Sequence, residues 1–263
     1  MKTVHCYIFI CLSLFACTKD NDYINSIEQD LQSMNMPRPA DSYNYPVYPG
    51  HPKWASFCTG EEMLKACQIP SWTARKMSTQ ALIQAIWEHP LLFEVFNRIQ
   101  YQGDFERLFF QNNAYMELVN RKDAGVSLHK RMVLVNPLTR YHSQILELLC
   151  SQSVFLAKLN DNEKVKLVEI VLENDGIRQS TENFYNSHRY VSWLLISRIM
   201  LAANYAPFIE AVNSSDGLRF FLGISFPEGQ YPSHEDIITY LTQPQDDFIE
   251  QIINLCKKYT NKF

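Results

Sequence analysis

Apolar side chains recur every three or four positions along most of this chain, which is the spacing of one face of an α-helix. Stripes of this kind run through residues 141–149, 165–172 and 248–256. Residues 190–203 are apolar nearly all round, apart from serines and Arg198. Such a segment is typical of a helix that is surrounded by other helices. The pattern predicts an all-α fold, an irregular helical bundle with solenoid-like helix-turn-helix pairs.

Two short apolar runs are the strongest candidates for strands. Residues 133–135 and 220–222 each continue a helical pattern and stop at Asn136-Pro137 or at Gly223. They therefore support helices rather than a sheet. Four similar segments place two apolar residues three apart and finish on asparagine, a residue that tolerates the left-handed conformation at the end of a helix. These asparagines are Asn97, Asn120, Asn160 and Asn213.

Cap signals mark where individual helices begin. Thr59-Gly60-Glu61-Glu62 has the spacing of a capping box, in which Glu62 reaches back to the amide of Thr59. The paired acids of this segment are then caps and not catalysts. Ser78 predicts the start of a second helix that ends near His89.

The N-terminal segment has the order of parts of a cleavable signal peptide. Lys2 precedes an apolar run over residues 4–15. The run is too short to cross a bilayer as a stable helix, which favours removal of the segment over a membrane-spanning anchor.

The end of this run, Leu14-Phe15-Ala16-Cys17, resembles a bacterial lipobox. The charged stretch that follows it resembles the export signal of surface lipoproteins in the Bacteroides group. The resemblance implies that residues 1–16 are a lipoprotein signal peptide and that Cys17 is the lipid attachment site, the palmitate-carrying first residue. A plain secretory signal is the alternative, because Phe15 is bulkier than the residue usually found there.

The segment between the signal peptide and the helical part is polar and then rich in proline and tyrosine. We predict a tether over residues 17–50 and a helical domain over residues 51–263. The prolines favour extended backbone, along which aromatic side chains recur. One interpretation is a platform for a sugar ring or peptide, and the favoured one is an arm that packs its rings on the helical body. The aromatic residues are Tyr43, Tyr45, Tyr48 and Trp54.

The net charge bears on the possible binding partners, and the cysteines bear on disulfide formation. The formal net charge is −4, and it becomes about −5 without Lys2, so no nucleic-acid partner is expected. Four cysteines follow Cys17. We expect Cys150 and Cys256 to be buried free thiols. We also expect Cys58 and Cys67 not to be bonded to each other, because the helix between them would place their α-carbons about 13 Å apart.

Few residues suggest chemistry. The sequence has no GxSxG, HExxH or phosphate-binding glycine loop. His129 and His142 with Glu147 form the best metal candidate, and His142 with Cys150 the best nucleophile pair, but neither spacing is specific. His142 and Cys150 would lie about 12 Å apart along one helix, too far for a hydrogen bond. We expect no catalytic residue, no metal and no cofactor.

The combination of lipobox, acidic leader, the proline- and tyrosine-rich segment 39–50, Trp54 and the cap at residues 59–64 resembles a group of secreted, helical surface lipoproteins of Bacteroides-type gut bacteria. The resemblance implies an exported cell-envelope protein and assigns no catalytic residue. Two function classes follow. The favoured one is a non-catalytic binding module at the outer membrane or cell surface, with a membrane anchor and a protein, peptide or glycan ligand. The alternative is an envelope hydrolase whose site is assembled from distant residues.

Overall fold

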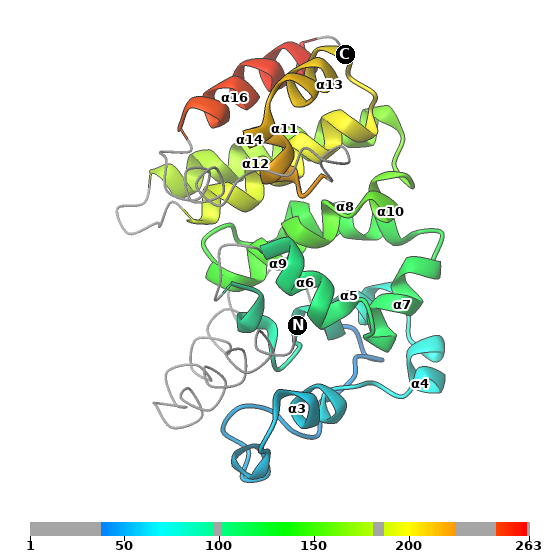
Figure 1. Cartoon of the computed structure of the whole chain (residues 1–263). Helices are drawn as coiled ribbons and strands as arrows, with labels where there is room; N and C mark the ends of the chain where they lie inside the picture. The colour runs from blue at the N-terminus through cyan, green and yellow to red at the C-terminus, as the bar shows by residue number, and fades with distance from the viewer. Residues whose placement is uncertain (1–37, 97–100, 181–186, 225–245, 262–263) are drawn as a thin grey trace. The chain divides into compact units, whose positions relative to one another are not determined.

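The structure is a computed structural model, and it describes residues 38–96, 101–180, 187–224 and 246–261. These residues form α-helices and short 3₁₀ helices joined by turns, with no β-strand among them (Figure 1). The predicted all-α fold is confirmed. The chain divides into two compact units, the first ending at Arg121 and the second beginning at Lys122, except that the start of α6 (Tyr101–Phe109) is grouped with the second. The helical domain that we expected over residues 51–263 therefore comprises most of unit 1 and all of unit 2.

Unit 1 is built around α5, whose residues are nearly all buried. Helix α7 packs against both α5 and α4. The helical elements of this unit are η2 (Trp54–Ser56), α3 (Gly60–Ala66), α4 (Ser71–Lys76), α5 (Thr79–Trp87), η3 (Leu92–Phe96), α6 (Tyr101–Phe109) and α7 (Asn113–Asn120).

The predicted caps of unit 1 are confirmed. The Thr59 hydroxyl accepts a hydrogen bond from the Glu62 amide at 3.2 Å, and the Glu62 carboxylate accepts one from the Thr59 amide at 3.3 Å. Ser78 caps α5 through the Ala81 amide. These side chains satisfy amide groups that have no partner inside the first turn of a helix, so short helices can start at defined residues.

Unit 2 places two helices at its centre, α9 and α12, which pack against each other. Helix α12 also contacts α11 and α16, which explains why its sequence is apolar nearly all round. The helices of unit 2 are α8 (Ala124–Leu134), α9 (Arg140–Cys150), α10 (Ser153–Leu156), α11 (Asp161–Gln179), α12 (Ser187–Ala202), α13 (Ala206–Ser214), α14 (Asp216–Leu222) and α16 (Asp246–Thr260). Both suspected strand segments, 133–135 and 220–222, lie in or at the ends of helices, as predicted.

The hydropathy of the helices bears on membrane insertion. Within the described ranges, no single helix is both long and apolar enough to cross a membrane. The segments Tyr190–Ala202 and Ala206–Ser214 meet that criterion only as a pair, with a bend of 116° between them.

None of the described asparagines of the predicted set adopts the left-handed conformation that can end a helix. Asn204 is the one described residue other than glycine with a positive φ, and it does not belong to the predicted set. Asn160 instead caps the start of α11 and forms a capping box with Glu163. Asn120 is the last residue of α7 and Asn213 is the last but one of α13, so both mark the ends of helices as predicted, and Asn97 is outside the described residues. An asparagine side chain serves either end of a helix, so its presence marks a boundary without giving the direction.

The cysteines behave as expected. Cys58, Cys67, Cys150 and Cys256 are free thiols, and all but Cys58 are buried. The helix that starts after Thr59 separates Cys58 from Cys67, which agrees with the geometric argument against a bond between them.

A matched pair of glycines in unit 2 gives a first test of the packing. A Cβ added at Gly125 in α8 would lie 2.8 Å from the Phe155 carbonyl oxygen, whereas one at Gly176 in α11 meets no atom within 4 Å. Gly125→Ala should therefore destabilise the protein by about 1–3 kcal/mol, because backbone must move. Gly176→Ala should stabilise it by about 0.5–1 kcal/mol through a lower entropy of the unfolded chain. Urea unfolding of both variants measures the difference, and equal effects would contradict the close approach of α8 and α10.

Candidate functional site

The predicted lipid attachment site, Cys17, and the signal peptide over residues 1–16 lie outside the described residues. The same holds for the first part of the tether, residues 17–37. The described residues offer three candidate sites: the aromatic arm, the buried polar residues and the surface of unit 2.

The arm over residues 38–50 is attached to helix α5. The Arg38 guanidinium pairs with the Glu88 carboxylate at 2.8 Å. The Asp41 carboxylate accepts hydrogen bonds from the Ser78 amide at 2.6 Å and the Ser78 hydroxyl at 3.0 Å. The hydrogen bond with the Ser78 amide is the main reason that the pKa of Asp41 is lowered. This part of the predicted tether is therefore a segment of unit 1.

The four aromatic residues of the predicted platform, Tyr43, Tyr45, Tyr48 and Trp54, differ in their surroundings. Tyr45 donates a hydrogen bond from its hydroxyl to the Ala85 carbonyl at 2.9 Å, and its ring meets those of Tyr43 and His89 edge-on. Trp54 is buried beside Phe57. Of the four, Tyr48 alone is largely exposed, at 46 %. The hydrogen bond of Tyr45 and the burial of Trp54 agree with the packing interpretation.

Two tyrosines of the arm provide a matched comparison. Tyr45→Ala removes a ring packed against unit 1 together with its hydrogen bond to α5, and we expect a loss of about 2–4 kcal/mol of unfolding free energy. Tyr48→Ala removes an exposed ring and should change stability by about 0.5 kcal/mol or less. Thermal unfolding of both variants checks this. Equal melting temperatures would contradict the packed arm.

The candidate metal and nucleophile residues do not form a site. Within the described part of the chain, no group of three or more His, Cys, Asp or Glu side chains could hold a metal ion. His129 lies on α8 and His142 on α9. Cys150 is buried, and burial with the nearby charge of Glu147 raises the pKa of its thiol far above the ordinary value. A thiol of this kind stays protonated and is a poor nucleophile.

A buried ion pair between Glu147 and Arg178 lies in the described part of unit 2, and no sequence pattern predicted it. An Arg178 guanidinium nitrogen lies 2.7 Å from a carboxylate oxygen of Glu147, with side-chain exposures of 1 % and 0 %. The Ser192 hydroxyl donates to Glu147 at 2.8 Å and accepts from Arg178 at 2.8 Å. Arg178 also donates to the Pro137 carbonyl at 2.9 Å. The network links α9, α11, α12 and the turn before α9.

This network has the character of a structural element. Burial raises the pKa of Glu147, and the positive charge of Arg178 and the bond from Ser192 oppose that rise. Both charged side chains are sealed from solvent, so a substrate has no route to them. A helical periodicity argument could have located Arg178, because Val168, Val171, Asp175 and Arg178 continue one face of α11.

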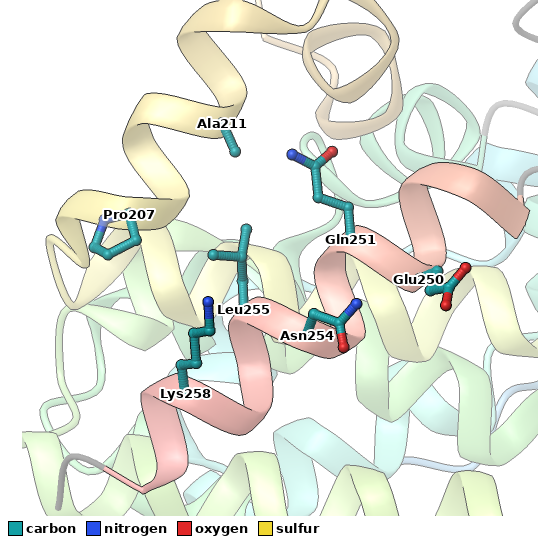
Figure 2. Close-up of a pocket in the computed structure, with 7 residues that line it drawn as sticks. All are labelled: Pro207, Ala211, Glu250, Gln251, Asn254, Leu255 and Lys258. Atoms are coloured by element: carbon teal, nitrogen blue, oxygen red, sulfur yellow. The ribbon is translucent and has the colours of Figure 1, made fainter.

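The described surface of unit 2 carries a groove between α13 and α16, with a volume of about 460 Å³ (Figure 2). Leu255 and Gln251 point from α16 toward α13. On the α13 side, the groove is lined by Pro207 and by the small side chain of Ala211. The remaining lining residues come from α16 and are polar: Glu250, Asn254 and Lys258.

The charges of the groove are separated along α16. Glu250 and Lys258 are eight residues apart, so their α-carbons lie about 12 Å from each other at 1.5 Å per residue. They cannot act together on one proton, and no histidine or cysteine lines the groove. The groove therefore has the composition of a binding surface: an apolar strip with one acidic and one basic end. The sequence feature that could have indicated this groove is the polar face of residues 250–258, which lies opposite the apolar stripe of the same helix.

Comparison of the chain with protein-family models, with curated proteins and with solved structures gave no match.

Proposed function

We propose that this protein is a non-catalytic interaction module of the cell envelope, held at the outer membrane by a lipid on Cys17. The α13–α16 groove is the surface that receives the partner, a helical segment of a protein. The observation that carries the proposal is the composition of the groove, in which an apolar strip runs between Glu250 and Lys258 without a pair of groups placed for acid–base chemistry.

A helical ligand suits the groove for a geometric reason. Pro207, Ala211 and Leu255 offer apolar area and a small side chain that lets another backbone approach. A helix presents side chains at matching intervals of three and four residues, so its apolar stripe can lie between the two charged ends. An envelope hydrolase is the weaker alternative, since the buried Glu147 and Arg178 are inaccessible and the groove has no nucleophile with a neighbouring base.

The groove is tested by site-specific photo-crosslinking in intact cells. A photoreactive residue at Gln251 should capture a protein, whereas the same residue at Lys130, exposed on α8, should not. Capture at both positions or at neither would overturn the proposal that this groove is the interaction surface.

The lipid anchor is tested separately. Cys17→Ser should abolish acylation and leave an unprocessed precursor or a soluble protein, because the acyl chains supply the membrane affinity. Detergent-phase partition and intact mass of the isolated protein are the measurements. A variant that keeps the mature mass and the detergent-phase partition of the wild type would contradict the anchor.

A further inference from the structure

We infer that the occupant of the α13–α16 groove is a second copy of this chain, and that two copies pair through antiparallel α16 helices. The inference rests on the proposed function, because it uses the same groove, and it names the partner. Its basis is the self-complementary order of side chains on α16.

The lining residues of α16 are symmetric about Asn254. Glu250 lies four residues before Asn254 and Lys258 four residues after it, so the three form one stripe along the helix. A two-fold axis through Asn254 places Glu250 of each copy opposite Lys258 of the other. Contact between identical surfaces of this kind is the usual arrangement of a dimer with two-fold symmetry.

The ends of α16 add to this complementarity. The helix begins at Asp246, and Lys257 and Lys258 lie in its last turn. Glu250, Lys257 and Lys258 are exposed. Antiparallel pairing brings Glu250 of each copy near Lys257 and Lys258 of the other, whereas parallel pairing would place like charges together. Within the described residues, neither Glu250 nor Lys258 has an ion pair of its own.

An apolar strip borders the centre of the contact. Leu255 borders the Asn254 stripe on the side that points toward α13, where it lines the groove together with Pro207 and Ala211. Asn254 donates and accepts through its amide and can bond to its own symmetry mate across the axis. A polar pair at such a position sets the register of two helices, as in coiled coils.

The contact is of modest size, because α16 has 15 residues and a length of about 22 Å. We expect dissociation constants in the micromolar range, of about 1–100 µM, as for small interfaces. Two copies anchored in one membrane would meet at a raised effective concentration, which favours pairing in the cell.

Cross-linking of full-length protein in its native membranes tests the pairing. In a Cys58→Ser background, which removes the exposed thiol, Asn254→Cys should give a covalent dimer with a short bis-maleimide. Lys130→Cys, on α8, should give at least about 5-fold less dimer, because this exposed position is outside the groove.

Charge reversal then distinguishes pairing from chance collision. Glu250→Lys or Lys258→Glu alone should weaken association about 10- to 30-fold, since the symmetry makes both ion pairs repulsive. A mixture of the two variants should recover pairing as a heterodimer, and the double variant E250K/K258E should recover it as a homodimer. Lys130→Glu should have no effect. Circular dichroism of each variant verifies that the fold is kept.

The outcomes separate this inference from the proposed function. A dimer at Asn254 that does not respond to charge reversal overturns the antiparallel register. Absence of the Asn254 dimer, together with capture of a different protein at Gln251, overturns self-association and leaves the interaction module standing. Absence of both products overturns the inference and the proposed groove.

Discussion

Replacing Arg178 by methionine is expected to destabilise unit 2 by about 3–5 kcal/mol at neutral pH. The change removes the positive charge that lies 2.7 Å from Glu147 and leaves a carboxylate with no solvent exposure inside the unit. It also removes the donor to the Pro137 carbonyl, which ties α11 to the turn before α9. The cost comes mainly from the charge left behind, because a buried carboxylate has lost its hydration.

The double variant Glu147→Gln/Arg178→Met is the control for that explanation. It removes both charges, so it should be more stable than Arg178→Met alone by about 2 kcal/mol. Urea unfolding, with hydrogen exchange of peptides from α9 and α12, measures the effect in unit 2. A double variant that is less stable than the single one would show that the bonds themselves, and not the uncompensated charge, dominate.

The Arg178 variant should also acquire a pH dependence. Burial raises the pKa of Glu147, and the charge of Arg178 opposes the rise, so removing Arg178 raises this pKa further. When an acid has a higher pKa in the folded state, the folded state binds more protons, and stability falls as the pH rises through that pKa. The destabilisation should therefore be smaller at pH 5 than at pH 8. Equal destabilisation at both pH values would contradict a carboxylate that takes up a proton.

Acidification is expected to destabilise unit 1 through His89. The imidazole is 2 % exposed, between the rings of Tyr45 and Phe109, and its Nδ1 accepts a hydrogen bond from the Leu91 amide at 3.2 Å. Burial lowers the pKa of His89 to about 3. The unfolded chain binds this proton near pH 6.5, so stability falls as the pH drops below that value. The loss should be about 2 kcal/mol between pH 7 and pH 5.

His89→Asn tests this source of acid sensitivity. Asparagine keeps an acceptor near the Leu91 amide and does not titrate, so the variant should lose about 2 kcal/mol less than the wild type between pH 7 and pH 5. Hydrogen exchange of α5 peptides at both pH values reports on unit 1 separately from unit 2. An unchanged pH slope in the variant would assign the acid sensitivity to other groups.

Short-range patterns in the sequence were sufficient to predict many of the helices and several of their first residues. The Thr59 capping box and the Ser78 cap depend on neighbours within four residues, and so does the apolar character of α12. The asparagine pattern marked the ends of α7 and α13 but was wrong for Asn160, which starts α11 instead of ending the helix before it, because asparagine stabilises both ends of helices. The local sequence around Asn160 is compatible with the end of one helix or the start of the next, and the packing of the helices decides between them.

By itself, the sequence determined that this chain is helical and where several of its helices begin, because hydrogen bonds and side-chain caps within one turn decide these features. Only the tertiary structure paired Glu147 with Arg178, buried His89 under Tyr45, and placed Pro207 and Ala211 opposite Leu255. Each of these contacts joins residues 31 to 48 positions apart. Such pairing follows from the packing of whole helix faces, in which many sequences of similar pattern fit equally well, so no local signal identifies the partner.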